Sequence, residues 1–175
     1  MSNTNCPECG HDQTSLDTSD LPDLITVTTV RIADELHIHP ASVLRTRPGP
    51  KHWSPLEYAC HVRDVLLVQR DRLYRALVED EPDCTPMHRD RRAVLARYNH
   101  QDPLHVASQT IIAADLAADA FVAVDAADWN RPLLYHWPAT RIITIAELAH
   151  HSTHETVHHL NDIRKNLQQE TQPHQ

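Results

Sequence analysis

The stretch WSPLEYACHVRD, residues 53–64, contains the clearest helix start in the chain. Ser54 can cap a helix, Pro55 suits its first position, and Glu57 completes a capping box with Ser54. Apolar residues then recur at helical spacing until the acidic region around Pro82. The sequence therefore predicts a long amphipathic helix that begins at this point.

Further segments on either side of this helix have helical patterns. They begin with proline or a capping residue and span residues 22–40, 102–124 and 144–167. At the start of the last segment, Thr144 and Glu147 form a second capping box. We expect residues 81–101 to form a connector long enough to cross the bundle, with one short helix near residues 91–98, and residues 129–140 to form a loop. Helical segments without a convincing alternating strand predict an all-α four-helix bundle.

The composition sets the domain organisation and argues against several classes of partner. A chain of 175 residues suits a Cys-containing tail over residues 1–20, the bundle over residues 21–170 and a disordered end over residues 171–175. The net charge of −8 argues against a nucleic-acid partner. The sequence shows no basic leader and no apolar run of membrane-spanning length, so we expect a cytoplasmic protein without a membrane partner.

Histidine occurs 15 times, and its densest cluster lies in AHHSTHETVHHLNDIR, residues 149–164. Residues four positions apart lie on the same face of a helix, so His154 and His158 can reach one ion. His151 lies on the same stripe and is a candidate extra ligand. Surface helices of His-rich proteins also produce such pairs by accident, and a firmly bound metal needs a third ligand from elsewhere in the fold.

We choose His61 as the third ligand. It shares one helix face with Trp53, Glu57 and Asp64, because these residues follow one another at spacings of three or four. Facing helices supply the metal ligands of bundle proteins. The alternative interpretation is a buried histidine with ordinary polar partners. The neighbouring Cys60 points about 100° away around the helix and is expected in the core.

Together these motifs resemble the DinB-like family of four-helix metalloproteins over residues 22–167. RYNHQDP at 97–103 and VHHLNDI at 157–163 extend the resemblance to an actinobacterial branch that begins with a CPECG tail. The resemblance implies thiol-dependent chemistry like that of mycothiol-dependent maleylpyruvate isomerases and bacillithiol transferases, and a homodimer. It also implies one divalent metal ion, zinc or alternatively nickel or iron, bound by the matching residues His61, His154 and His158.

This chemistry suggests roles for further residues. A metal site with an open position favours the anionic form of a thiol, and the thiolate would attack a small electrophilic substrate. Glu57 and Asp64 are candidate orienters of His61, with the helix cap as an equally good role for Glu57. Arg63 and Arg97 are candidates to bind a carboxylate of the thiol cofactor.

Two other classes of function stay open. Residues 154–158 read HETVH, which matches the HExxH motif, so Glu155 could act as general base on a metal-bound water in a hydrolase. The bundle pattern and the short chain after this motif disfavour a peptidase. The remaining class is a protein that binds metal without turnover.

Cys6 and Cys9 in CPECG have the spacing of half a structural zinc site. A second CxxC does not follow. His11, Cys84 together with His88, or the same turn of a second subunit could complete a set of four ligands. The alternative is a reduced, solvated tail.

Overall fold

The computed structural model describes residues 5–12 and 16–170. Its four long helices are α1 (Leu21–Ile38), α3 (Pro55–Val78), α5 (Pro103–Val122) and α6 (Ile145–Glu170). The shorter elements are η1 (Thr18–Asp20), α2 (Ala41–Leu44), β1 (Asp83–Cys84), α4 (Arg89–Leu95), η2 (Tyr98–His100), β2 (Pro132–His136) and β3 (Thr140–Thr144). The predicted four-helix bundle is confirmed. The expected disordered end, residues 171–175, lies outside the described residues.

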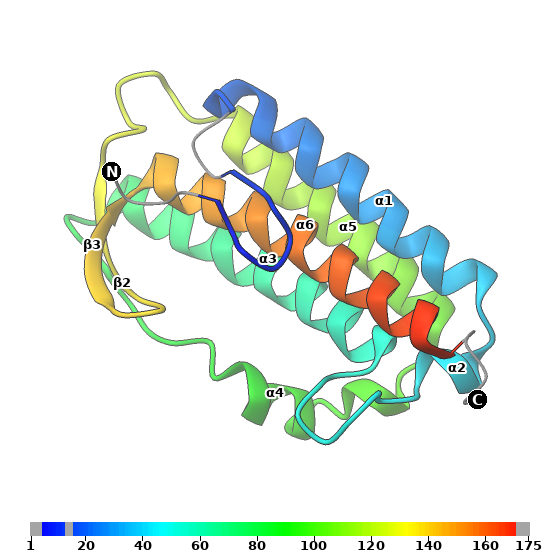
Figure 1. Ribbon diagram of the computed structural model, residues 1–175. Helices are drawn as coiled ribbons and strands as arrows, with labels where there is room; N and C mark the ends of the chain where they lie inside the picture. The colour runs from blue at the N-terminus through cyan, green and yellow to red at the C-terminus, as the bar shows by residue number, and fades with distance from the viewer. Residues whose placement is uncertain (1–4, 13–15, 171–175) are drawn as a thin grey trace.

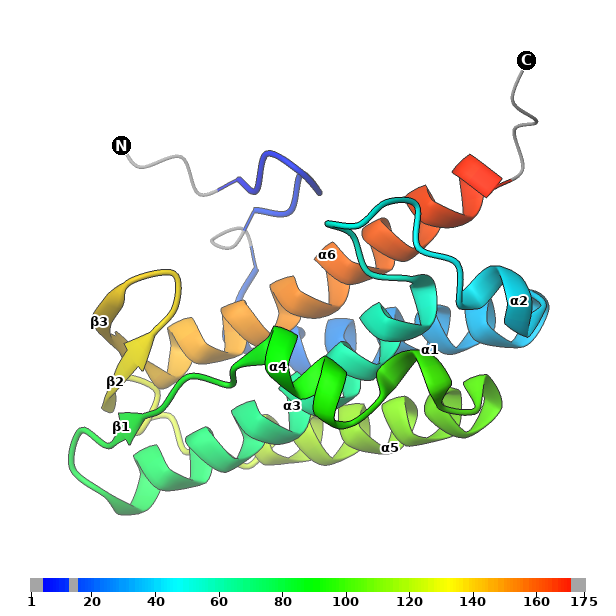
Figure 2. The ribbon, with the colours of Figure 1, turned by 90° about the horizontal axis from the view of Figure 1, so that it is seen from below.

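The long helices form a closed bundle in which α1 and α3 each pack on both α5 and α6. Helices α1 and α6 run in one direction along the bundle, and α3 and α5 run in the other (Figure 1). Because α3 and α5 are parallel, residues 79–102 must return along the whole bundle before α5 begins. Figure 2 shows this connector, with β1 at one end and α4 along the way. The crossing connector was expected from its length.

Local capping fixes the starts of two bundle helices. At α3, the Ser54 side chain accepts from the Glu57 backbone at 3.2 Å, and the Glu57 carboxylate accepts from the Ser54 backbone at 2.9 Å. At α6, Thr144 and Glu147 form the same reciprocal pair, at 3.2 and 2.9 Å. Both predicted capping boxes are confirmed.

The predicted loop over residues 129–140 is wrong for residues 132–136, which form β2, and for Thr140, which begins β3. Strand β2 pairs antiparallel with β3 from Pro132 opposite Thr144 to His136 opposite Thr140, and β1 adds in parallel on the other side of β2. Leu133 and Tyr135 alternate into the core, where both are buried. Pro132 lies at the strand end, beyond the residues that pair with β1, so it does not interrupt that ladder.

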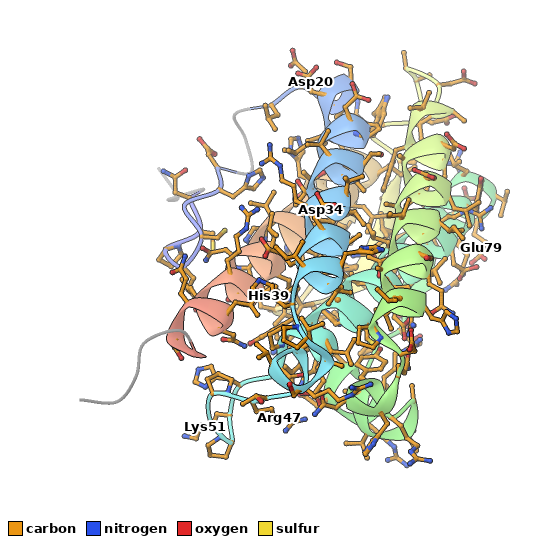
Figure 3. All side chains as sticks on the ribbon, turned by 90° about the vertical axis from the view of Figure 1, so that its right-hand side faces the viewer. Asp20, Asp34, His39, Arg47, Lys51 and Glu79 are labelled. Atoms are coloured by element: carbon orange, nitrogen blue, oxygen red, sulfur yellow. The ribbon has the colours of Figure 1, made fainter. Side chains whose placement is uncertain are left out.

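The ends of the bundle carry the short connections. Figure 3 shows Asp20 and His39 at opposite ends of α1, with Arg47 and Lys51 in the loop that leads to α3.

Among the described residues, no helix is both long enough and apolar enough to cross a membrane.

Candidate metal centre

His61 lies at the centre of a polar cluster between α3 and α6. Its side chain is buried, and Nε2 lies 3.1 Å from Oε2 of Glu155. The His159 ring stands edge-on to the His61 ring, with the centroids 4.9 Å apart. One donor atom from each of these three residues lies within 4.8 Å of the others, so His61, Glu155 and His159 form a group that could hold a metal ion.

The structure does not bring together the three ligands expected from the sequence. His154 and His158 belong to a separate group with Cys6 and Cys9, whereas His61 faces the next stripe of α6. Each residue turns an α-helix by about 100°, so the pair at 154 and 158 and the pair at 155 and 159 point in different directions. The candidate ligands that α6 offers to a metal at His61 are therefore Glu155 and His159, each one residue after a histidine of the predicted pair.

Two carboxylates hold His159 on both sides. Its Nδ1 donates to Asp162 at 2.9 Å, and its Nε2 lies 3.3 Å from Glu155. Burial would lower the pKa of His159, but the hydrogen bonds to Asp162 and Glu155 outweigh burial and raise it to about 9. Without metal, a proton on His159 thus supplies the positive charge between these acids.

The pKa values of Glu155 and His61 are both lowered, but for different reasons. Burial would raise the pKa of Glu155, but hydrogen bonds from His159 and His61 hold it well below its usual value. Burial lowers the pKa of His61, although Glu155 acts in the opposite direction. His61 is thus held neutral, as a metal ligand must be, while Glu155 is held ionised.

His151 lies next to this group, one turn before Glu155. Its Nε2 is 3.5 Å from Oε1 of Glu155, and its ring contacts the Tyr135 ring edge-on. His151 was expected as an extra ligand beside His154 and His158. In the structure it contacts Glu155 instead and lies outside the group formed by His154 and His158.

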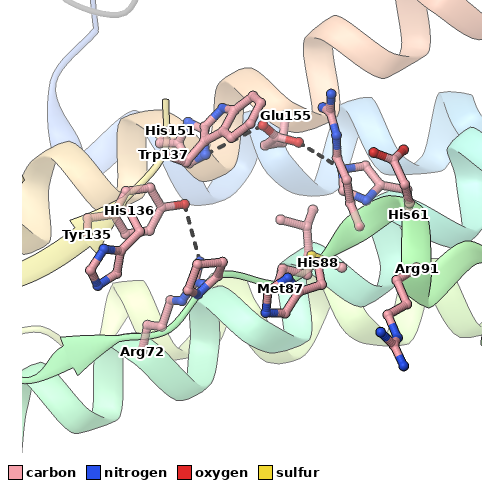
Figure 4. Close-up of a pocket in the computed structure, with 14 residues that line it drawn as sticks. His61, Arg72, Met87, His88, Arg91, Tyr135, His136, Trp137, His151 and Glu155 are labelled. Atoms are coloured by element: carbon pink, nitrogen blue, oxygen red, sulfur yellow. Dashed lines mark hydrogen bonds and ion pairs between the residues drawn. The ribbon is translucent and has the colours of Figure 1, made fainter. Parts of the chain in front are cut away.

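A cavity of about 390 Å³ opens beside the group. His61 and Glu155 line it, and Figure 4 shows them facing the space between α6 and the chain segment around Met87. Trp137 and Met87 add apolar walls. A bound ion at His61 and Glu155 would therefore be accessible to a small molecule in the cavity.

Arg72 is a buried cation in the wall of this cavity. It donates to the side chains of Gln69 and Tyr135 and to the main-chain carbonyl of Thr85. Its guanidinium lies 4.9 Å from the centroid of the Tyr135 ring. Among the described residues, no carboxylate lies within ion-pair distance of Arg72, so its charge has only neutral partners.

The two carboxylates expected to orient His61 are engaged elsewhere. Glu57 closes the α3 capping box and pairs with Arg47. Asp64 accepts from the Tyr98 hydroxyl at 2.6 Å and from Arg63 at 2.7 Å. The structure therefore assigns Glu57 to the helix cap and Asp64 to a contact with η2, and Glu155 is the carboxylate that contacts His61.

The two arginines proposed for the thiol cofactor also lie away from the cavity lining. Arg63 donates to Gln101 at 2.8 Å and to Gln109 at 2.7 Å, besides its bond to Asp64. Arg97 is exposed and has a left-handed backbone just before η2. Sequence reasoning missed Arg72, because nothing in its neighbourhood along the chain distinguishes it from a surface arginine.

The donor set of the group at His61 fits a divalent metal. Two imidazoles with one carboxylate occur in catalytic zinc sites and in non-haem iron(II) sites, and they leave an open position. Nδ1 of His61 is buried and finds no hydrogen-bond partner within the described part of the chain, so the local polar network is incomplete as it stands. The fit to an ion rests on the types of donor and on their convergence within 4.8 Å of one another.

Comparisons with known proteins agree with this architecture. Residues 26–163 match the family model described as the DinB superfamily. The solved structure of YfiT from Bacillus subtilis, described as a probable metal-dependent hydrolase with an unusual four-helix bundle topology, superposes with a TM-score of 0.81 at 15% identity. The match covers 90% of this chain and 91% of that chain, and the likeness concerns the fold. No curated protein sequence matches this chain.

Proposed function

Because the chain belongs to the DinB superfamily, we propose that it is a metal-dependent enzyme whose catalytic ion is held by His61, Glu155 and His159. The observation that carries this proposal is the convergence of three donor groups within 4.8 Å of one another. Two of the three also line a cavity of about 390 Å³, which lies in the size range of small-molecule sites, roughly 300–1,000 Å³.

The protein's own residues prepare the centre. Asp162 accepts the Nδ1 proton of His159 and leaves Nε2 directed at Glu155, which fixes the tautomer and the orientation of the ring. His151 lies on the other side of Glu155 and faces the cavity. A divalent ion bound here supplies a Lewis acid that favours the anionic form of a thiol or of water.

Arg72 indicates the class of substrate. A buried cation whose partners are all neutral is costly unless an anion completes its surroundings. Its place in the cavity wall suits a carboxylate, which a guanidinium binds through charge-assisted hydrogen bonds. We therefore propose transfer of a low-molecular-weight thiol, of the mycothiol type, to a small electrophile, with the carboxylate on either molecule.

Thiol transfer can be tested with two matched electrophiles, 4-chloro-3-nitrobenzoate and its neutral amide, in the presence of mycothiol. We expect the zinc-loaded protein to form the thioether, with release of chloride, faster with the carboxylate than with the amide. EDTA or His61→Asn should return the rate to that of the protein-free reaction. His105→Asn, an exposed histidine of α5, is the matched control and should react like the wild type. A rate above the protein-free background that survives in both EDTA and His61→Asn would contradict the proposal.

A metal-dependent hydrolase is the second candidate, favoured by the fold shared with YfiT and by the description of that protein. The HExxH version of this hypothesis needs His154 and His158 as ligands with Glu155 as base. In the structure those histidines face Cys6 and Cys9, and Glu155 lies with His61. Metal-dependent cleavage of 4-nitrophenyl acetate without thiol would favour a hydrolase that uses the centre at His61.

A further inference from the structure

Residues 5–12, which we call the N-terminal hairpin, fold into a tight turn around the CPECG motif. Asn5 and Asp12 form an isolated antiparallel β-bridge. The Cys6 amide donates to the His11 carbonyl at 3.0 Å, and the Gly10 amide donates to the Cys6 carbonyl at 2.8 Å. Gly10 has a φ of +73°, a conformation that suits glycine, and this turn brings both thiols to one side of the hairpin.

The N-terminal hairpin lies across the outer face of α6 (Figures 1 and 2). The main-chain carbonyl of Glu8 accepts from Asn161 at 3.2 Å and from Lys165 at 3.1 Å, both on α6. His11 stacks on His154, with the ring centroids 5.9 Å apart. The hairpin is therefore positioned over one stripe of this helix, the stripe that carries the HxxxH pair.

Two thiols from the N-terminal hairpin meet two imidazoles from α6 at this contact. Sγ of Cys6 lies 3.6 Å from Nδ1 of His158, and the rings of His154 and His158 lie 5.2 Å apart. One donor atom from each of the four residues lies within 4.8 Å of all the others. Nε2 of His154 is buried and has no hydrogen-bond partner in the described part of the chain.

We propose that a structural zinc ion fastens the N-terminal hairpin to α6 through two thiolates and two imidazoles, those of Cys6, Cys9, His154 and His158. Two cysteines and two histidines form a closed tetrahedral set, which is typical of structural zinc and leaves no position for a substrate. On binding, the two thiols release their protons to solvent. Their two negative charges then balance Zn²⁺, so the site gains no net charge.

The surroundings of His158 support a ligand role for its Nδ1. Its Nε2 lies 3.3 Å from the Glu8 carboxylate and 3.4 Å from the Asp162 carboxylate. Carboxylates at the far nitrogen are the usual partners of zinc-binding histidines, because they fix the tautomer that leaves the other nitrogen free. The nitrogen left free here is the one that faces Cys6.

This site completes the CxxC half-site in a way that the sequence did not indicate. His11 contacts His154 from outside the group of four, Cys84 is buried in β1, and His88 lines the cavity. The partner is instead the HxxxH pair, more than 140 residues away along the chain. The site shares no ligand with the centre at His61 and does not depend on the proposed enzymatic activity.

Zinc content of protein purified from zinc-supplemented cells tests the proposal. We expect two zinc ions per chain in the wild type and one in Cys6→Ser/Cys9→Ser. These two substitutions change no side chain of the hydrophobic core. Cys84→Ser is the matched thiol control and should keep two. If the centre at His61 binds no metal, these values fall to one and zero, so the two proposals fail separately. Equal zinc content in the wild type and the double variant would overturn this proposal.

Cobalt(II) substitution adds a readout specific to sulfur. The wild type should show a thiolate-to-cobalt charge-transfer band in the near ultraviolet, and His154→Asn, His158→Asn and Cys6→Ser/Cys9→Ser should each lose or weaken it. X-ray absorption at the zinc edge should give Zn–S distances of about 2.3 Å. A cobalt-loaded wild type without this band, or a zinc spectrum without sulfur, would contradict the site.

Discussion

His159 donates through Nδ1 to Oδ2 of Asp162 at 2.9 Å, which leaves the opposite nitrogen of the ring facing Glu155. A carboxylate in this position fixes the tautomer of a metal-binding imidazole and raises its basicity. The same carboxylate lies 3.4 Å from Nε2 of His158. Asp162 therefore lies between the two proposed metal sites and contacts a ligand of each.

Asp162→Asn should weaken metal binding at His61 without abolishing it. The amide keeps the size of the side chain but removes the charge that holds His159, and loss of such a partner lowers metal affinity by about 10–100-fold. Chelator competition in the Cys6→Ser/Cys9→Ser background measures this site alone. Asp115→Asn, on the exposed face of α5, should not change the affinity. An unchanged Kd in Asp162→Asn would remove the proposed role of this carboxylate.

The metal-free protein should lose a His159 contribution to stability at alkaline pH. The pKa of His159 is about 9 in the folded protein, above its ordinary value of 6.5, so the folded state binds the proton more tightly. The contribution is complete below pH 6.5 and is lost as the pH rises through 9. Between these values, the stability advantage of wild type over His159→Gln should shrink by at most about 3 kcal/mol.

Chemical denaturation in EDTA over this pH range gives the free energy of unfolding of both proteins. Measuring the difference between them removes the titration of groups that do not contact His159. The pKa values of Glu155, Asp162 and His61 depend on His159, so these groups contribute to the difference together with it. A difference that stays constant from neutral to alkaline pH would show that His159 does not carry the proton.

Arg72→Gln should impair the binding of anionic substrates selectively. Hydrogen bonds to charged groups contribute about 1.5–3 kcal/mol, so KM for 4-chloro-3-nitrobenzoate should rise roughly 10- to 100-fold while KM for the neutral amide changes little. Arg72→Lys should restore part of the loss. Arg97→Gln, at an exposed position outside the cavity lining, is the matched control. Equal losses for both electrophiles would contradict an anion-binding role.

Glu57→Gln should affect stability rather than metal binding. The variant loses the ion pair of a nearly buried carboxylate with Arg47 and weakens its bond to the Ser54 amide, which together should cost about 1–2 kcal/mol. Thermal unfolding of the zinc-loaded variant measures the loss. Zinc content should equal that of the wild type. A fall in zinc content without a fall in stability would favour the alternative role of Glu57 as an orienter of His61.

The features predicted correctly from the sequence are those encoded locally. Ser54 with Glu57, and Thr144 with Glu147, are complete signals for a helix start within four residues. The β2–β3 hairpin lacks such a signal, because Leu133 and Tyr135 are recognisable as inward-facing only when the bundle beneath them is known. From the sequence alone, Pro132 and Pro138 on either side of these residues favour a loop.

The ligands expected on α6 differ from those that the structure brings near His61, for a related reason. Two pairs with a spacing of four interleave along this helix, one at residues 154 and 158 and the other at residues 155 and 159. Both pairs can bind a metal, and a shift of one residue rotates the choice by about 100°. Only the docking of α3 on one side and of the N-terminal hairpin on the other decides which pair faces His61.

Zinc content of two single variants in the Cys6→Ser/Cys9→Ser background tests this assignment most directly. With the N-terminal site removed, we predict close to one zinc ion per chain in His158→Asn and almost none in His159→Asn. Circular dichroism would confirm that both variants keep the helical fold. The reverse result, with zinc retained in His159→Asn and lost in His158→Asn, would contradict the metal centre at His61, Glu155 and His159.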